Sequence, residues 1–207
     1  MKKQTPPNPA VKRLSLYLRH LEALVAEGSR SVSSTQLARR LGGQATQVRK
    51  DLACFGQFGR RGVGYDVAEL ADHLRHVLRT DHVRNVVLVG AGALGSALIR
   101  FGGFGRRGFK FVAAFDVSPR RVGTQVEGVP ILHIDQLAAI VHNNGVKLAV
   151  VAVPNWAAQQ VVDQLGQAGV TGVLNFAPAA LDTPANVSVG QVDLAASLEE
   201  LSFRVGD

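Results

Sequence analysis

Three glycines with the spacing G-x-G-x-x-G are the residues of this chain whose types and positions most directly suggest chemistry. They are Gly90, Gly92 and Gly95, where a short apolar run gives way to an amphipathic one in VLVGAGALGSAL. At a strand-to-helix junction the first glycine permits a tight turn, the second lets a pyrophosphate approach the backbone, and the third lets helix and strand pack closely. Free amides at the start of the helix then face the phosphates. We therefore expect a dinucleotide to bind here.

An acidic residue follows at the spacing that such a site requires. Asp116 lies near the end of the segment KFVAAFDV, 21 residues after Gly95, where a carboxylate accepts hydrogen bonds from the adenine ribose. Because a carboxylate would repel the 2′-phosphate of NADP, Asp116 favours NAD. Arg120 and Arg121 follow closely enough to approach a phosphate, so NADP and coenzyme A stay open as ligands.

The elements that must position these residues form an alternating pattern. Further strands are expected at VPILHI, KLAVVAV and TGVLNFA, with helices over 135–143 and 156–167, which predicts an α/β fold with a doubly wound parallel (Rossmann) sheet. Ligands lie beyond the carboxyl ends of such strands, so VAVPN and NFAP should wall the nicotinamide half of the site. The residues expected to hold NADH or NAD+ are Gly90, Ala91, Gly92, Ala93, Leu94, Gly95, Asp116, Val117, Arg121, Val153, Pro154, Asn175 and Phe176.

The positive charge of the chain is concentrated before this region. Residues 1–80 carry 14 lysines and arginines against 6 acidic residues, a net charge of +8, whereas residues 81–207 carry 9 against 10. Such asymmetry is typical of a protein that binds a polyanion, most often nucleic acid. A solvated basic surface would produce the same totals.

The basic part shows the layout of a helix-turn-helix. A first amphipathic helix is expected over 11–27, a second short one in SVSSTQLARRLGG, and a third in QATQVRKDLACFGQFG with Ala45, Val48 and Leu52 facing inward. A fourth, over about 66–80, closes the domain. The outer face of the third helix would enter the major groove of double-stranded DNA, with Gln47 and Arg49 on base edges and Lys50 on phosphate; Thr46 lies on the same face.

A glycine-rich turn, GRRGVGYDV, follows the third helix and carries Arg60 and Arg61 at its tip. This resembles the wing of a winged helix, whose arginines enter the minor groove or clamp the backbone. The alternative is a small helical bundle with a solvated basic face.

Little of the chain is left over for catalysis. About 25 residues follow Ala180, which is short for a substrate domain. His133 is the best candidate for proton transfer but has no partner at a recognisable spacing, and no metal cluster, nucleophile elbow or P-loop lysine is present. We therefore expect no enzyme, with a dinucleotide acting as a signal. The alternatives are a small NAD- or coenzyme A-dependent enzyme with a basic appendage and a DNA-binding protein that ignores its cofactor.

Other features bear on the compartment. The N-terminus MKKQTPPNPAVKRL has no apolar run after its charges, and no window of about 18 residues could span a bilayer. The single Cys54, expected to pack beside Leu52 and Phe55, agrees with a reducing compartment. We expect a cytoplasmic protein that does not contact membranes.

Taken in order, these blocks resemble the redox-sensing transcriptional repressor Rex family over essentially the whole chain. The blocks that carry the resemblance are QVRKDLACFGQFGRRGVGYDV, VGAGALGSAL, FDVSP, VAVP and VLNFAP. The resemblance implies a homodimeric winged-helix repressor that binds a palindromic operator when NADH is low and releases it when NADH binds. It implies a winged-helix domain over 1–80, a Rossmann NAD(H)-binding domain over 81–193, and a C-terminal helix over 194–207 that is exchanged between subunits.

Two positions depart from the family pattern. Family members commonly carry a tyrosine near the nicotinamide, paired with an aspartate before the exchanged helix; Phe101 stands at the first position and Asp193 matches the second. Both belong to the expected cofactor site, although Phe101 cannot make that hydrogen bond. Ala93 stands where some relatives have a basic residue. We expect Phe101 and Phe176 to form an apolar wall that prefers the neutral, reduced nicotinamide ring.

Overall fold

The computed structural model describes residues 8–59 and 63–205, and it divides into two compact units, 1–82 and 83–207. The expected boundary after residue 80 lies two residues before this division. Each unit has its own apolar core.

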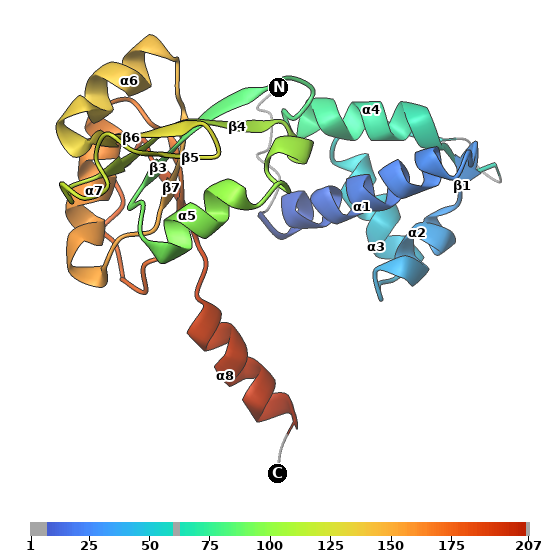
Figure 1. Ribbon diagram of the computed structural model, residues 1–207. Coiled ribbons are helices and arrows are strands. Elements are labelled where there is room, and N and C mark those ends of the chain that lie inside the picture. Colours follow the sequence, from blue (N-terminus) through green and yellow to red (C-terminus); the bar gives the residue numbers. More distant parts are fainter. Residues whose placement is uncertain (1–7, 60–62, 206–207) are drawn as a thin grey trace. The chain divides into compact units, whose positions relative to one another are not determined.

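The first unit is a small helical domain with a two-stranded sheet (Figure 1). Its core is formed by leucines and valines spaced along each helix, such as Leu14, Leu21, Val48, Leu52 and Leu74. The strands β1 and β2 pair antiparallel, as the base of a wing requires. The elements are α1 (Asn8–Ala26), β1 (Ser31–Val32), α2 (Ser34–Arg40), α3 (Ala45–Ala53), β2 (Tyr65–Asp66) and α4 (Val67–Val77).

Two helix ends differ from the expected ones for local reasons. The first helix begins at Asn8 rather than residue 11, because Pro9 lies in the first turn, where a backbone N–H would have no partner within the helix anyway. The fourth helix ends at Val77 rather than near residue 80, because Arg79 adopts a left-handed conformation with φ of 55°. α2 begins as predicted after Ser33, whose side chain forms a reciprocal capping box with Gln36.

The second unit is built on a seven-stranded sheet with the order β5-β6-β4-β3-β7-β8-β9. Only the β5–β6 pair is antiparallel, so the predicted doubly wound parallel sheet is confirmed. The strands are β3 (Arg84–Val89), β4 (Phe109–Asp116), β5 (Gln125–Val126), β6 (Val129–His133), β7 (Leu148–Val151), β8 (Gly172–Asn175) and β9 (Ser188–Gln191).

Helices pack on both faces of this sheet. α6 (Leu137–Asn143) and α7 (Asn155–Gln167) share one core with Val87, Val89 and Phe115, whereas α5 (Ala93–Arg100) shares the other with Val86 and Leu88. Short 3-10 turns lie at Gly105–Arg107 and Ile134–Gln136, so the first turn of the helix expected over 135–143 is not α-helical. The core of the unit therefore consists of two apolar layers separated by the sheet.

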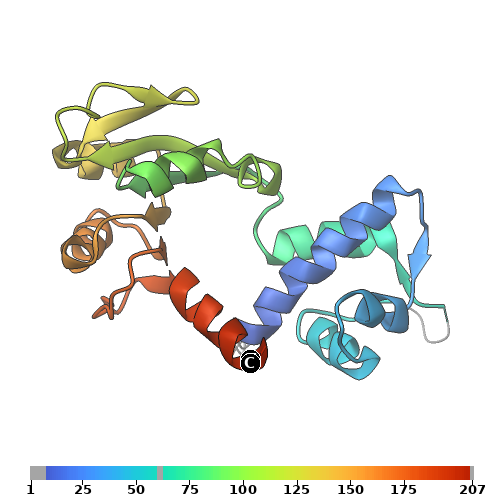
Figure 2. The ribbon, with the colours of Figure 1, turned by 60° about the horizontal axis from the view of Figure 1, so that its bottom comes forward.

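The last helix, α8 (Leu194–Val205), extends away from the sheet and buries none of its residues (Figures 1 and 2). Its apolar side chains are Leu194, Leu198, Leu201, Phe203 and Val205, which are 54–89% exposed. Among the described helices, none is long and apolar enough to cross a membrane.

Candidate cofactor site and nucleic-acid interface

The three glycines of the fingerprint differ in what surrounds them. Gly90 has φ of +95°, and a Cβ there would overlap the carbonyl oxygen of Ala152. A Cβ on Gly95, in the first turn of α5, would overlap the carbonyl oxygen of Gly90. Gly92 is the N-cap of α5 and has open space where its Cβ would be. The loop is therefore held tightly at its two ends and is open at its centre, as a phosphate-binding turn requires.

Asp116 and Arg121 both hold the peptide units of this loop. Asp116, at the carboxyl end of β4, accepts a hydrogen bond from the Ala91 amide at 3.0 Å and one from the Ser118 amide at 2.9 Å. The Arg121 guanidinium donates to the carbonyl oxygen of Ala91. Asp116 and Arg121 therefore fix the peptide units at Ala91 from both sides, and the Arg121 guanidinium is engaged with the loop backbone.

A cavity of about 330 Å³ opens at the carboxyl ends of β3, β4 and β7. Six expected site residues line it: Gly90, Gly92, Asp116, Val117, Val153 and Pro154. Its wall also includes Trp156 and Gln160 of α7, which the sequence interpretation missed. The only signal in the sequence was the position of Trp156, directly after the VAVPN stretch nominated as a wall. Ala93 and Leu94 are exposed in the first turn of α5, beside the loop.

Asn175 has a structural role that the sequence did not indicate. Its side chain is fully buried, donates to the Ala177 carbonyl and the Gln191 amide oxygen at 2.9 Å each, and accepts from the Ala177 amide at 3.0 Å. Asn175 and Gln191 are register partners on β8 and β9. The side-chain amide is therefore engaged in fixing the edge of the sheet and does not line the cavity.

The residues assigned to the nicotinamide half are divided by the structure: Val153 and Pro154 line the cavity beside Asp116, whereas Phe101, Phe176 and Asp193 lie outside it. Phe176 is half-buried against the core on the α5 side. Phe101 follows the last residue of α5, is 59% exposed, and contacts Phe104 edge-to-face with 5.6 Å between ring centroids. The Asp193 carboxylate accepts from the Ala196 amide at the start of α8. The cavity therefore contains Asp116, the residue expected to bind the adenine ribose, together with part of the stretch expected at the nicotinamide.

Two expectations about reactive side chains are wrong. His133 does have a carboxylate partner, since its Nδ1 lies 3.0 Å from Asp135, although both side chains are exposed. Cys54 does not pack beside Leu52; it is exposed, and its thiol donates to the carbonyl oxygen of Lys50 at 3.3 Å.

The third helix presents the expected polar face. Val48 and Leu52 are buried, whereas Thr46, Gln47, Arg49 and Lys50 are exposed. Arg49 donates to the Ser34 hydroxyl at 2.8 Å, so it bridges α3 to the start of α2. Gln47 is not a free base reader, because its side-chain amide donates to Asp51 at 2.7 Å. Arg60 and Arg61 lie outside the described residues.

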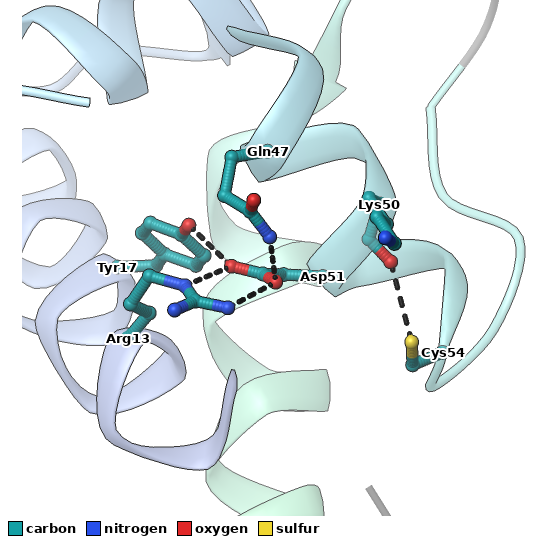
Figure 3. A network of polar contacts seen from close by, with 6 residues as sticks. All are labelled: Arg13, Tyr17, Gln47, Lys50, Asp51 and Cys54. Atoms are coloured by element: carbon teal, nitrogen blue, oxygen red, sulfur yellow. Dashed lines mark hydrogen bonds and ion pairs between the residues drawn. The ribbon is translucent and has the colours of Figure 1, made fainter. Parts of the chain in front are cut away.

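Asp51, which the sequence interpretation missed, lies at the centre of a polar network with Arg13, Tyr17 and Gln47 (Figure 3). Its carboxylate is buried and accepts hydrogen bonds from Gln47, from the Tyr17 hydroxyl at 2.7 Å, and from Arg13 at 2.6 and 2.7 Å. Burial raises the pKa of Asp51, but the bonds from Arg13, Tyr17 and Gln47 outweigh it and keep the pKa below its ordinary value. The carboxylate is therefore ionised and ties α3 to α1. The sequence did contain a signal for this contact: Arg13 and Tyr17 lie four residues apart, on the same side of α1 as its buried leucines.

Comparison with family models matches the two units separately. Residues 7–53 match the family described as "Putative DNA-binding protein N-terminus", and residues 81–179 match "CoA binding domain". The second description covers the sheet domain with the glycine loop, which is consistent with a nucleotide site.

Individual relatives cover nearly the whole chain. The redox-sensing transcriptional repressors Rex of Carboxydothermus hydrogenoformans and Desulfitobacterium hafniense are 46% and 43% identical, over 96% and 100% of this chain and 96% and 98% of their own. The crystal structure of RSP in complex with β-NAD+ and operator DNA matches with a TM-score of 0.92 at 32% identity, and that with β-NADH with 0.87 at 31%. These matches cover 98% of this chain and 93% and 95% of RSP. With its helix-turn-helix, its Rossmann sheet and relatives of this similarity along its full length, the chain belongs to the redox-sensing transcriptional repressor Rex family.

Proposed function

We propose that this chain is a repressor that binds operator DNA when NADH is scarce and releases it when NADH binds. The observation that carries the proposal is the glycine loop held by Asp116 and open at Gly92, in the same chain as a basic helix-turn-helix. The solved complexes of RSP with β-NAD+ and operator DNA and with β-NADH support it. The cofactor is a signal and is not consumed.

The residues around the loop suit the dinucleotide in this role. The amides at the start of α5 face the phosphates through the opening at Gly92, and Asp116 has acceptor capacity left for ribose hydroxyls. NADH and NAD+ share this half of the molecule and differ in the charge of the nicotinamide ring. Since a ligand shifts an equilibrium only by its differential affinity for the two states, the switch depends on the nicotinamide half.

DNA binding is assigned to the first unit. Arg49 and Lys50 on α3, with Thr46 beside them, would lie in the major groove and against phosphates, and Arg60 and Arg61 would act from the wing. Gln47, restrained by Asp51, contributes mainly to the position of this face. A dimer that binds a palindrome must match half-site spacing, so a ligand that reorients its two DNA-binding units changes its affinity.

The dimer itself is supported by two unmatched apolar surfaces. α8 exposes its leucines and Phe203, and the α5 side of the sheet contains an apolar hollow of about 300 Å³ lined by Val86, Phe104, Leu148, Val150 and Leu174, among others. Exchange of α8 between two copies in the cytoplasm would cover such surfaces, because exposed apolar faces of this kind are usually interfaces.

The deciding experiment is fluorescence anisotropy of the full chain with a palindromic operator at fixed salt, because phosphate contacts make the affinity salt-dependent. We expect release on addition of NADH and none with NAD+. Coenzyme A serves as the third ligand, in view of the matched family description. Operator binding that ignores NADH would refute sensing, and absence of any operator binding would refute repression.

The apolar wall remains a separate prediction. If Phe101 and Phe176 favour the neutral ring, replacing both with polar residues should reduce the NADH/NAD+ affinity ratio, because the charged ring would lose its disadvantage. The ratio is measured by calorimetric titration of both cofactors. An unchanged ratio in the folded double variant would show that the discrimination lies elsewhere.

A further inference from the structure

Trp156 is the only tryptophan in the chain and lies at an unusual place. It is in the first turn of α7, is 82% exposed, and lines the same cavity as Gly92, Asp116 and Val117. Tryptophan is on average among the most buried side chains, because its ring removes a large apolar area from water when covered. An indole so exposed on the wall of a cavity therefore has a large area available to an occupant.

The position of Asp116 identifies which part of the ligand would be that occupant. Asp116 marks the adenine ribose, and the adenine is joined directly to this sugar. Beyond Asp116 the cavity is mostly apolar, with Val117, Ile134, Val153 and Pro154 in its wall. An apolar cavity of this kind suits a flat heterocycle, and the indole of Trp156 forms one side of it.

We propose that Trp156 stacks on the adenine ring of the bound dinucleotide and supplies affinity that NADH and NAD+ share. Gln160 lies four residues further along the same helix and lines the same cavity, and its amide can both donate and accept, as the edge of adenine does. This inference rests on the proposed function, since it concerns the same site.

The exposure of Trp156 has an alternative explanation, because its side chain also borders a second hollow. Asn155, Gln159, Pro178 and Leu181 line this hollow. A second protein chain covering the indole there would explain its exposure equally. Adenine is favoured because Trp156 shares a cavity wall with the ribose-binding carboxylate, and the two occupants make opposite predictions for a truncated side chain.

The test compares Trp156→Ala and Trp156→Phe with the wild type in calorimetric titrations of NADH and of NAD+. Aromatic stacking on a base is worth about 1–3 kcal/mol by alanine substitution. We expect Trp156→Ala to weaken both cofactors by the same factor, about tenfold, and Trp156→Phe to keep most of the affinity. Gln167→Ala, an exposed change at the other end of α7, serves as the matched control.

The fluorescence of Trp156, the only indole in the chain, should also report binding at this cavity directly. AMP and ADP-ribose should alter the fluorescence of Trp156 in the wild type, whereas nicotinamide mononucleotide should not. Unchanged cofactor affinity in Trp156→Ala, or loss of the dimer in sedimentation instead of affinity, would overturn the stacking while leaving the proposed function intact. A wild type that binds neither NADH nor NAD+ would overturn both.

Discussion

Replacing Arg13 with alanine is expected to lower the free energy of unfolding of the first unit by about 2–4 kcal/mol, because it leaves the Asp51 carboxylate without its ionic partner. The side chain of Asp51 is only 3% exposed, so water cannot replace the lost donor atoms. Urea denaturation followed by circular dichroism measures the loss. Affinity for operator DNA should fall as well, since only the Tyr17 hydroxyl would then connect α1 to α3 through Asp51.

The matched control is Arg75→Ala. Arg75 is 34% exposed, as Arg13 is 35%, but its carboxylate partners Glu22 and Asp72 are 30% and 76% exposed. Its loss should therefore cost under about 1 kcal/mol. Adding Asp51→Asn to Arg13→Ala should recover part of the stability, because the buried charge is gone. Equal losses for Arg13→Ala and Arg75→Ala would contradict the argument.

The Arg13–Asp51 ion pair should also make the free energy of unfolding of the first unit depend on pH. Because the pKa of Asp51 is lowered in the folded state, its contribution is complete above the ordinary pKa of an aspartate, about 4, and is lost as pH falls through the folded value. The difference in free energy of unfolding between wild type and Arg13→Ala should accordingly become smaller as the pH falls. Urea midpoints measured from neutral pH down to about pH 3 test this.

Gly95→Ala is expected to destabilise the second unit by about 3 kcal/mol, because the new methyl group overlaps the backbone oxygen of Gly90 and neither backbone segment can move without opening the loop. Calorimetric unfolding measures the loss. Gly92→Ala is the matched change: φ of −62° suits alanine and nothing lies near the new Cβ.

For Gly92→Ala we therefore expect almost unchanged stability and at least a tenfold loss of affinity for both NADH and NAD+, since the methyl group occupies the opening through which the pyrophosphate reaches the amides of α5. Cofactor titration measures it. Wild-type affinity in this variant would place the phosphates elsewhere, and wild-type stability in Gly95→Ala would refute the close packing.

The features predicted from the sequence are those encoded by neighbouring residues. Gly90 specifies a left-handed turn, Gly95 a close approach of helix and loop, and Asp116 ends a largely buried strand, so the fold and the glycine loop with its carboxylate could be derived from local patterns. Apolar periodicity likewise predicted the four helices of the first unit, and the largest differences at their ends lie next to Pro9 and Arg79.

What escaped prediction depends on partners distant in the sequence. Arg13, the ionic partner of Asp51, lies 38 residues earlier, so the spacing within α3 could not show that Asp51 is buried in an ion pair. The bond that restrains Gln47 is local, at i, i+4 spacing to Asp51, and was overlooked. Asn175 ends a strand as a ligand-binding residue would, but Gln191, 16 residues later, engages its amide. Asp116 ends β4 and Trp156 lies in α7, far apart in the sequence. Only the folding of the sheet brings both residues to one cavity.

The exposed face of α8 couples the folding of this helix to assembly of the protein. A helix of 12 residues that buries none of its side chains is marginal in water on its own. Its order must come from whatever covers Leu198, Leu201 and Phe203, and in the proposed dimer that cover is a second chain. Folding of this segment and assembly are then one event governed by mass action. The amount of protein in the cell would thus set how much working sensor exists, before any cofactor is bound.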